Sequence, residues 1–161
     1  MIDQLPEWLQ IFLFSMIPGF ESRFTIPLIA INQFGWIWWK AFPYAIIGNM
    51  ILVPFGLLFL HKIEKILSRI SFFKKAMDIV FPKIRRKADK KIQRYESLAL
   101  VFFVAVPLPF TGAGLGTLIA YLFDLKFSRS LLMIYIGVLI STLFVTLIYL
   151  VGYFLIFEWQ S

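Results

Sequence analysis

Apolar residues fill most of this chain, and two of its long apolar runs are interrupted near the middle. The run over residues 8–34 contains Pro18, Gly19 and Pro27. The run over residues 98–123 contains prolines at 107 and 109 and glycines at 112, 114 and 116. Proline removes a backbone hydrogen-bond donor and breaks helices. Each run therefore predicts two half-length helices joined by a turn.

An unbroken apolar segment follows each interrupted run. Residues 42–60 and residues 131–157 are long enough, as helices, to cross a hydrocarbon core of about 30 Å. The pieces of the interrupted runs reach only about half that depth at about 1.5 Å per residue. We therefore expect residues 8–34 and residues 98–123 to form re-entrant helical hairpins, each of which enters and leaves the membrane by one face. One bent spanning helix is the alternative for residues 8–34.

A basic segment, residues 61–96, lies between the two halves and holds 12 of the 16 Lys and Arg residues. Its apolar residues recur at steps of three and four, which indicates amphipathic helices. The positive-inside rule places this segment in the cytoplasm. Its face with Lys83, Arg85, Arg86 and Lys87 is expected to contact anionic lipid head groups; the alternative is that the segment only sets the topology. Nucleic acid is not an expected partner, because a membrane tethers both ends.

The two halves follow the same order: a short run, a broken turn, a short return and a full span. Leu28-Ile29-Ala30 of the first half matches Leu118-Ile119-Ala120 of the second, and Gly48 matches Gly137. If the first hairpin enters from outside, the span over 42–60 leads inward, the second hairpin enters from inside and both termini lie outside. The predicted fold is an all-α, multi-pass membrane protein of one domain, residues 1–161, with an inverted repeat over residues 1–60 and 97–161.

Composition supports this class of protein. The chain is 60% hydrophobic and 16% charged, with a mean hydropathy of +0.83, whereas soluble domains are about 45–50% apolar and about 25% charged. The absence of cysteine and the single histidine argue against a metal site, and no cofactor is expected. No nucleophile–base set or phosphate-loop motif is present, so the sequence does not indicate an enzyme.

The first interrupted turn carries the clearest candidate chemistry. Glu21 and Arg23 are an acid and a base at membrane depth, where charged residues are functional-site candidates. The planar guanidinium of Arg23 suits phosphate oxygens, and Glu21 can accept a proton when an anion engages Arg23. The alternative is a salt bridge that only fixes the hairpin. The predicted substrate and proton site comprises Pro18, Glu21, Arg23, Pro27, Asn49, Pro107, Pro109, Thr111, Gly112 and Gly114.

Polar residues within the two spans have less specific explanations. Asn49 either makes an interhelical hydrogen bond or lines a pathway. A stripe on the last span is expected to face protein or a cavity, and packing is the preferred explanation; it comprises Tyr135, Thr142, Thr146, Tyr149 and Tyr153.

The interrupted turns also carry a family resemblance. Glu21, Arg23, Ile26 and Pro27, the Gly48-Asn49 pair, and the stretch Pro107-Leu108-Pro109 with Thr111-Gly112 and Leu118-Ile119-Ala120 resemble the small multidrug export protein family, whose members are similar to the DedA/VTT superfamily. The resemblance implies two opposed re-entrant hairpins and the translocation of a lipid-phosphate carrier such as undecaprenyl phosphate, coupled to protons. DedA proteins carry arginines in the second hairpin, and residues 110–117 have none, so Arg23 would bind the phosphate here.

Three functions follow from these observations. The first is a transporter of a lipid phosphate or another anionic amphiphile, with membrane lipids as partners. The second is a proton-coupled exporter of small amphiphilic drugs, which Arg23 disfavours because it would repel a cation. The third is a membrane scaffold without transport. Two spans and two hairpins are too few to enclose a pathway, so we expect a homo-oligomer, at least a dimer.

Overall fold

The computed structural model describes residues 4–67, 90–107, 112–123 and 125–160, and every regular element in these ranges is a helix. The two longest helices are α3 (Trp38–Leu67) and α7 (Phe127–Gln160). Their segments Trp38–Leu60 and Phe127–Ile156 are long and apolar enough to cross a membrane. The all-helical class and the two expected spans are thus present, each beginning about one turn earlier than the sequence suggested.

In the described part of the first half, three short helical segments of four residues or more precede α3. They are α1 (Glu7–Met16), α2 (Glu21–Phe24) and η2 (Thr25–Ile31). Helix α1 ends because Pro18 disfavours a helical residue before it, and Ile17 is extended with ψ 121°. The return segment is not a plain α-helix: around Pro27 it is a π-helix, in which the Asn32 N–H reaches back five residues to the Pro27 carbonyl at 3.2 Å.

The second half has a similar order. Helix α5 (Lys90–Ala105) ends just before Pro107, α6 (Ala113–Leu122) begins after Gly112, and α7 follows. Helix α5 begins inside the range that the sequence assigns to the basic segment. Helix α3 extends into the start of the same segment, to Leu67. The part between the two helices, residues 68–89 with Lys83, Arg85, Arg86 and Lys87, lies outside the described residues.

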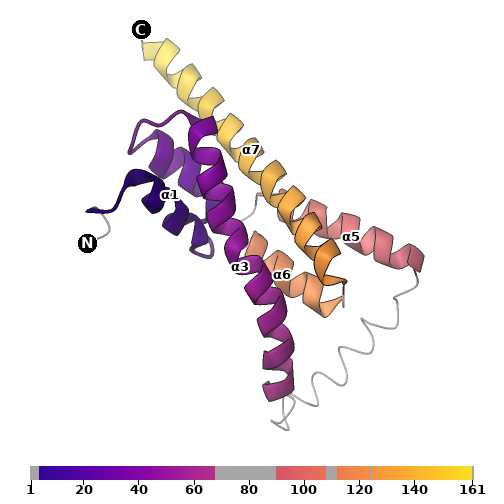
Figure 1. Ribbon diagram of the computed structural model, residues 1–161. Coiled ribbons are helices and arrows are strands. Elements are labelled where there is room, and N and C mark those ends of the chain that lie inside the picture. The colour runs from indigo at the N-terminus through magenta and orange to yellow at the C-terminus, as the bar shows by residue number, and fades with distance from the viewer. Residues whose placement is uncertain (1–3, 68–89, 108–111, 124, 161) are drawn as a thin grey trace.

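The two halves pack through each other's long helices. Helix α1 packs on α3 as α5 packs on α7, whereas α2 packs mainly on α7 and α6 mainly on α3. The π-helix η2 contacts both long helices. In Figure 1, α1 lies on one side of the crossing of α3 and α7, and α5 and α6 lie on the other. One buried cluster belongs to the first half: Ile11, Ile26, Ala30, Ala41 and Ala45. The other joins α3, α5, α6 and α7 and includes Val53, Leu100, Val104, Ala120 and Ile134.

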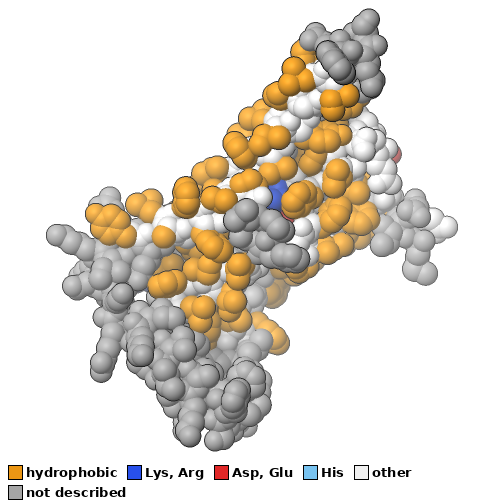
Figure 2. Space-filling view, turned by 180° about the vertical axis from the view of Figure 1, so that it is seen from behind, with side chains coloured by type: hydrophobic (Ala, Val, Ile, Leu, Met, Phe, Trp, Pro, Cys, Tyr) orange, Lys and Arg blue, Asp and Glu red, His pale blue; other side chains and the backbone are white. Residues whose placement is uncertain are grey.

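The outer surface of the long helices is apolar. Phe55 and Leu58 of α3 are 66% and 60% exposed, and Phe154 of α7 is 59% exposed. Figure 2 shows hydrophobic side chains over most of the described surface of one face. Such a surface is unfavourable in water but suits contact with lipid chains.

Candidate functional site

The turn after α1 brings Glu21 inward. Gly19 has φ 89° and Glu21 has φ 50°, and Glu21 is the only non-glycine residue with positive φ in the described part of the chain. The left-handed conformation costs an L-residue roughly 1–2 kcal/mol. Strained backbone of this kind collects at functional sites, where the surrounding structure holds it. The residue that carries it here is the acid that the sequence singled out.

Glu21 and Arg23 form a buried ion pair. The Nη2 group of Arg23 donates to Oε2 of Glu21 at 2.7 Å, and Nε donates to the same oxygen at 3.2 Å. The two side chains are only 4% (Arg23) and 8% (Glu21) exposed. Taking two charges out of water is unfavourable unless they pair closely. The pair therefore depends on both partners, and a change in the charge of either one would break it.

A chain of polar side chains links this turn to both long helices. The Asn49 side-chain amide on α3 donates to the Ser22 hydroxyl at 2.9 Å, and the Ser22 hydroxyl shares a 2.7 Å hydrogen bond with Thr142 on α7. Asn49 is the middle residue of the 23-residue segment Trp38–Leu60, and Thr142 lies at the middle of the 30-residue segment Phe127–Ile156. The ion pair beside Ser22 is therefore level with the middle of both candidate spans.

The second interrupted turn meets the first at Gly112. This residue precedes α6, and a Cβ atom built on it would overlap the Glu21 carboxylate. The first intrahelical bond of α6 runs from the Gly116 N–H to the Gly112 carbonyl at 2.9 Å. The N–H groups before Gly116 have no acceptor within the helix, and this end of a helix carries partial positive charge. The Glu21 carboxylate thus rests against the positive end of α6 as well as against Arg23.

A pocket of about 370 Å³ opens beside the carboxylate. It lies between the end of α1, the middle of α3 and the first turns of α6, and Arg23 does not line it. Its lining residues are mainly apolar, with Glu21, Asn49 and Thr117 as the exceptions; they also include Pro18, Leu52, Val53, Gly56, Phe59, Ala113, Gly114 and Leu118. The arrangement can hold a mostly apolar molecule with one polar group at the carboxylate.

The structure gathers several of the site residues that the sequence suggested. Pro18, Glu21, Asn49, Gly112 and Gly114 lie at the pocket or against the carboxylate, and Arg23 is paired with Glu21. Pro27 is buried within η2, and Pro107 directly follows α5 without a described contact to the pocket. Pro109 and Thr111 lie outside the described residues. The transport roles of all these residues stay predictions.

The site residues expected from the sequence did not include Ser22, Gly56 or Thr117. Ser22 is fully buried and bonds to both long helices, and its only signal was its place between two charged residues. Thr142 was noted in the α7 stripe but ascribed to packing. In that stripe Thr142 and Thr146 are buried, whereas Tyr135 and Tyr153 are 41% and 49% exposed. Within the described ranges, no three His, Asp or Glu side chains lie close enough together to hold a metal ion.

Comparison with known proteins gives one match. A family model described as "Putative small multi-drug export protein" matches residues 21–144. The matched segment begins at Glu21 and includes Asn49, Gly112 and Thr142, so it contains the ion pair and both turns. No curated protein and no solved structure matches the chain. Because the family model covers most of the sequence, the chain belongs to the small multi-drug export protein family.

Proposed function

We propose that this protein is an integral membrane transporter that moves an anionic amphiphile, such as a lipid phosphate, together with a proton. The observation that carries the proposal is the Glu21–Arg23 ion pair, buried level with the middle of both spans and opening onto a pocket. Burial of an ion pair among apolar helices is unfavourable enough to need a reason. A transport site, in which Arg23 exchanges the Glu21 carboxylate for an anionic substrate, supplies a reason for burying this ion pair.

The charges of the site favour an anion once Glu21 is protonated. With Glu21 ionised, the pair is neutral overall and Arg23 is held by the carboxylate. When Glu21 accepts a proton, Arg23 loses its ionic partner beside the positive end of α6. A guanidinium fork and free helix N–H groups are both suited to phosphate oxygens. Binding of the anion and of the proton would therefore support each other, which is the basis of symport.

We also propose that the two halves form an inverted repeat of re-entrant hairpins. Ala41, Ala45 and Gly48 on α3 have the same spacing as Ser130, Ile134 and Gly137 on α7, and all six are buried. A Cβ atom on Gly48 would meet the backbone of Phe12 in α1, and one on Gly137 would meet the carbonyl oxygen of Val101 in α5. Equivalent helix crossings therefore occur at equivalent positions, and both turns lie at the middle of the spans, as in inverted-repeat transporters.

Export of amphiphilic cations is the second candidate, and one observation favours it. Glu21 lines the mainly apolar pocket and Arg23 does not, so a cationic drug could meet the carboxylate first. The description of the family points the same way. Against it stands the close ion pair with Arg23, which a cation would have to displace.

Reconstitution in liposomes distinguishes these functions. The purified protein is tested with a labelled lipid phosphate and with a cationic dye, between about pH 5 and about pH 8. We expect faster movement of the lipid phosphate than in protein-free vesicles, with a rate that depends on pH. Proton-driven movement of the dye alone would support the second candidate. If neither compound moves, the result would favour a membrane scaffold without transport.

Matched variants test the role of the ion pair. We expect Glu21→Gln to remove the pH dependence, because the amide cannot exchange a proton, and Arg23→Lys to slow transport, because lysine lacks the planar fork. Glu7→Gln and Arg129→Lys are the controls, since both residues are exposed. Full transport by both Glu21→Gln and Arg23→Lys over the whole pH range would reduce the pair to a structural salt bridge.

A further inference from the structure

The Glu21 pocket adjoins a second hollow on the outside of α3. This hollow has a volume of about 460 Å³ and is lined by Leu52, Phe55, Gly56, Leu58 and Phe59. Leu52, Gly56 and Phe59 line both spaces. The two spaces therefore adjoin along α3, and together they are called the depression: its inner part, at Glu21, lies between α3 and α6, and its outer part lies on α3.

The rim of this depression faces lipid. Leu52 and Phe59 are 42% and 62% exposed, and Leu118 on α6 is 38% exposed, whereas Glu21 and Asn49 at the inner end are 6% and 5% exposed. The exposed rim residues on α3 lie within Trp38–Leu60, the segment fit to cross the hydrocarbon core. A molecule that enters here comes from among lipid chains, not from water.

Along α3, the described lining of the depression leads toward one membrane surface. From Asn49 to Phe59 is ten residues, or about 15 Å along a helix, which is half of a hydrocarbon core of about 30 Å. It therefore runs from the middle of the span to the surface at which the α3 span ends. On the α7 side of the site the described residues close it: Ser22, Thr25, Thr142 and Thr146 are fully buried, and Ser22 bonds to Thr142.

We propose that the substrate reaches Glu21 sideways, from the leaflet in which the α3 span ends, through the opening between α3 and α6 bounded by Leu52, Phe59 and Leu118. The head group passes along the depression to Glu21, while a long hydrocarbon chain stays among the lipid-facing side chains of α3. The inference rests on the proposed function, because it takes the same anionic head group. It adds that the substrate needs a long alkyl chain and that a small water-soluble phosphate is not carried.

Glycine 114 allows the depression to be filled without disturbing the fold. A Cβ atom on Gly114 has no atom within 4 Å, although Gly114 lines the pocket. Gly114→Leu therefore places a side chain in the pocket, and Leu52→Trp enlarges the rim. Gly152, which also has open space around it, and Leu147, which is 47% exposed on α7, provide the controls Gly152→Leu and Leu147→Trp.

The transport experiment compares dodecyl phosphate with methyl phosphate in liposomes. We expect wild-type protein and both controls to move dodecyl phosphate and not methyl phosphate. We expect Gly114→Leu and Leu52→Trp to slow dodecyl phosphate by about tenfold or more, the size of effect that steric mismatch has in apolar pockets. Undiminished rates in both variants, or equal rates for the two phosphates, would overturn sideways access and leave the transport function standing.

A binding experiment tests access even if no transport is seen. Dodecyl phosphate with a photoactivatable group in its chain is irradiated with the full-length protein in nanodiscs, and the labelled residues are mapped. Labelling at residues 52–59, absent in Gly114→Leu and retained in Gly152→Leu, supports the side opening independently of turnover. Labelling spread over α3 and α7, or unchanged in Gly114→Leu, overturns it. Side labelling without transport would instead count against the proposed function.

Discussion

At the scale of single residues, Glu21 is held by three constraints at once. Its backbone is left-handed, its carboxylate pairs with Arg23, and the same carboxylate fills the space where Gly112 lacks a side chain. The same carboxylate thus makes both contacts, one with Gly112 and one with Arg23. A small change at Gly112 should therefore act on the ion pair itself.

The first prediction concerns Gly112→Ala. The backbone of Gly112, with φ −76° and ψ −153°, suits any residue, so the effect of alanine comes only from its methyl group. We expect the free energy of unfolding to fall by about 1–3 kcal/mol, as for other overpacked sites, and transport to fall with it. Thermal unfolding in detergent, followed by circular dichroism, measures the change. Gly152→Ala is the control and should be neutral or stabilising by up to about 1 kcal/mol.

At the scale of helices, the close crossings of α1 with α3 and of α5 with α7 depend on one glycine each. A Cβ atom on Gly48 would lie 3.1 Å from the carbonyl carbon of Phe12. On Gly137 it would lie 2.7 Å from Cβ of Val104 and 3.0 Å from the Val101 carbonyl oxygen. Small residues let membrane helices approach closely in this way. The short helices are thus held against the long ones by the absence of a side chain.

We predict that Gly48→Ala and Gly137→Ala both lower the free energy of unfolding, by about 1–3 kcal/mol or more. Gly48→Ala should have the larger effect, because the new methyl group would meet backbone atoms of α1, which cannot rotate away as the Val104 side chain near Gly137 can. Adding Val104→Ala should partly rescue Gly137→Ala, since it removes Cγ1, which would lie 2.9 Å from the new Cβ atom, and lets the helices adjust around the Val104 Cβ that remains. Thermal unfolding of the single and double variants measures both effects. Equal stability of Gly48→Ala and wild type would show that α1 is not packed on α3 as described.

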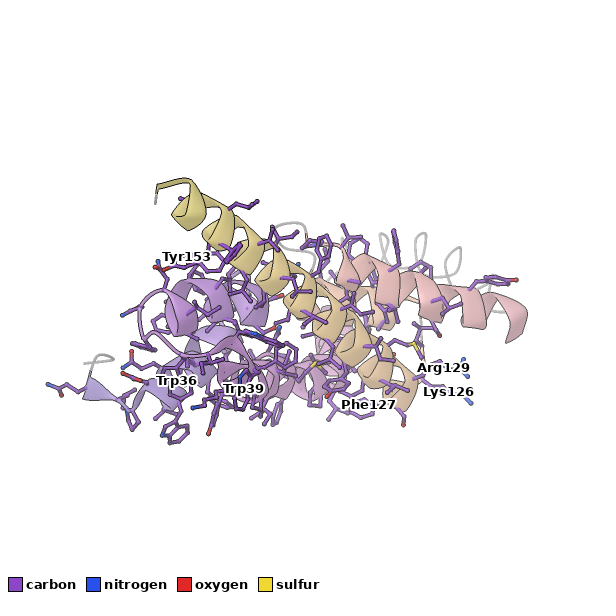
Figure 3. The ribbon with its side chains drawn as sticks, turned by 90° about the horizontal axis from the view of Figure 1, so that it is seen from above. Trp36, Trp39, Lys126, Phe127, Arg129 and Tyr153 are labelled. Atoms are coloured by element: carbon purple, nitrogen blue, oxygen red, sulfur yellow. The ribbon has the colours of Figure 1, made fainter. Side chains whose placement is uncertain are left out.

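At the scale of the whole molecule, the two ends differ in chemistry. Trp36, Trp39 and Tyr153 lie toward one end, and Lys126 and Arg129 lie at the other, as Figure 3 shows. Aromatic residues collect at membrane interfaces, and basic residues mark the cytoplasmic side. The Glu21 pocket lies between these ends, level with the middle of both spans.

We predict that the two ends are exposed on opposite sides of the membrane. The chain has no cysteine, so single substitutions such as Trp39→Cys and Arg129→Cys can be labelled without background. An impermeant thiol reagent should label Trp39→Cys and Tyr153→Cys from outside intact cells. The same reagent should label Lys126→Cys and Arg129→Cys only after the cells are permeabilised. Labelling of all four from one side would contradict both the spans and the inverted repeat.

The sequence by itself determined the class of protein, the two long spans and the places where the shorter helices break. These features are local. A long apolar run indicates burial in lipid, and proline or glycine within it indicates a break in the helix, whatever the tertiary contacts of the rest of the chain. The sequence also marked Glu21 and Arg23, because charge inside an apolar run is rare enough to need a reason. No charge or other residue pattern predicted the π-helical turn around Pro27.

Only the tertiary structure decided how the site is assembled. Ser22 and Thr142 are 120 residues apart in the chain and 2.7 Å apart in space. The sequence placed Gly112 in the site as part of the second interrupted turn, but only the structure shows that a Cβ atom on it would overlap the Glu21 carboxylate of the other half. Glu21 lines the pocket while Arg23 lies outside it, although the two charges are only two residues apart in the sequence. Such contacts depend on how separate helices pack, and no local pattern of residues records that packing.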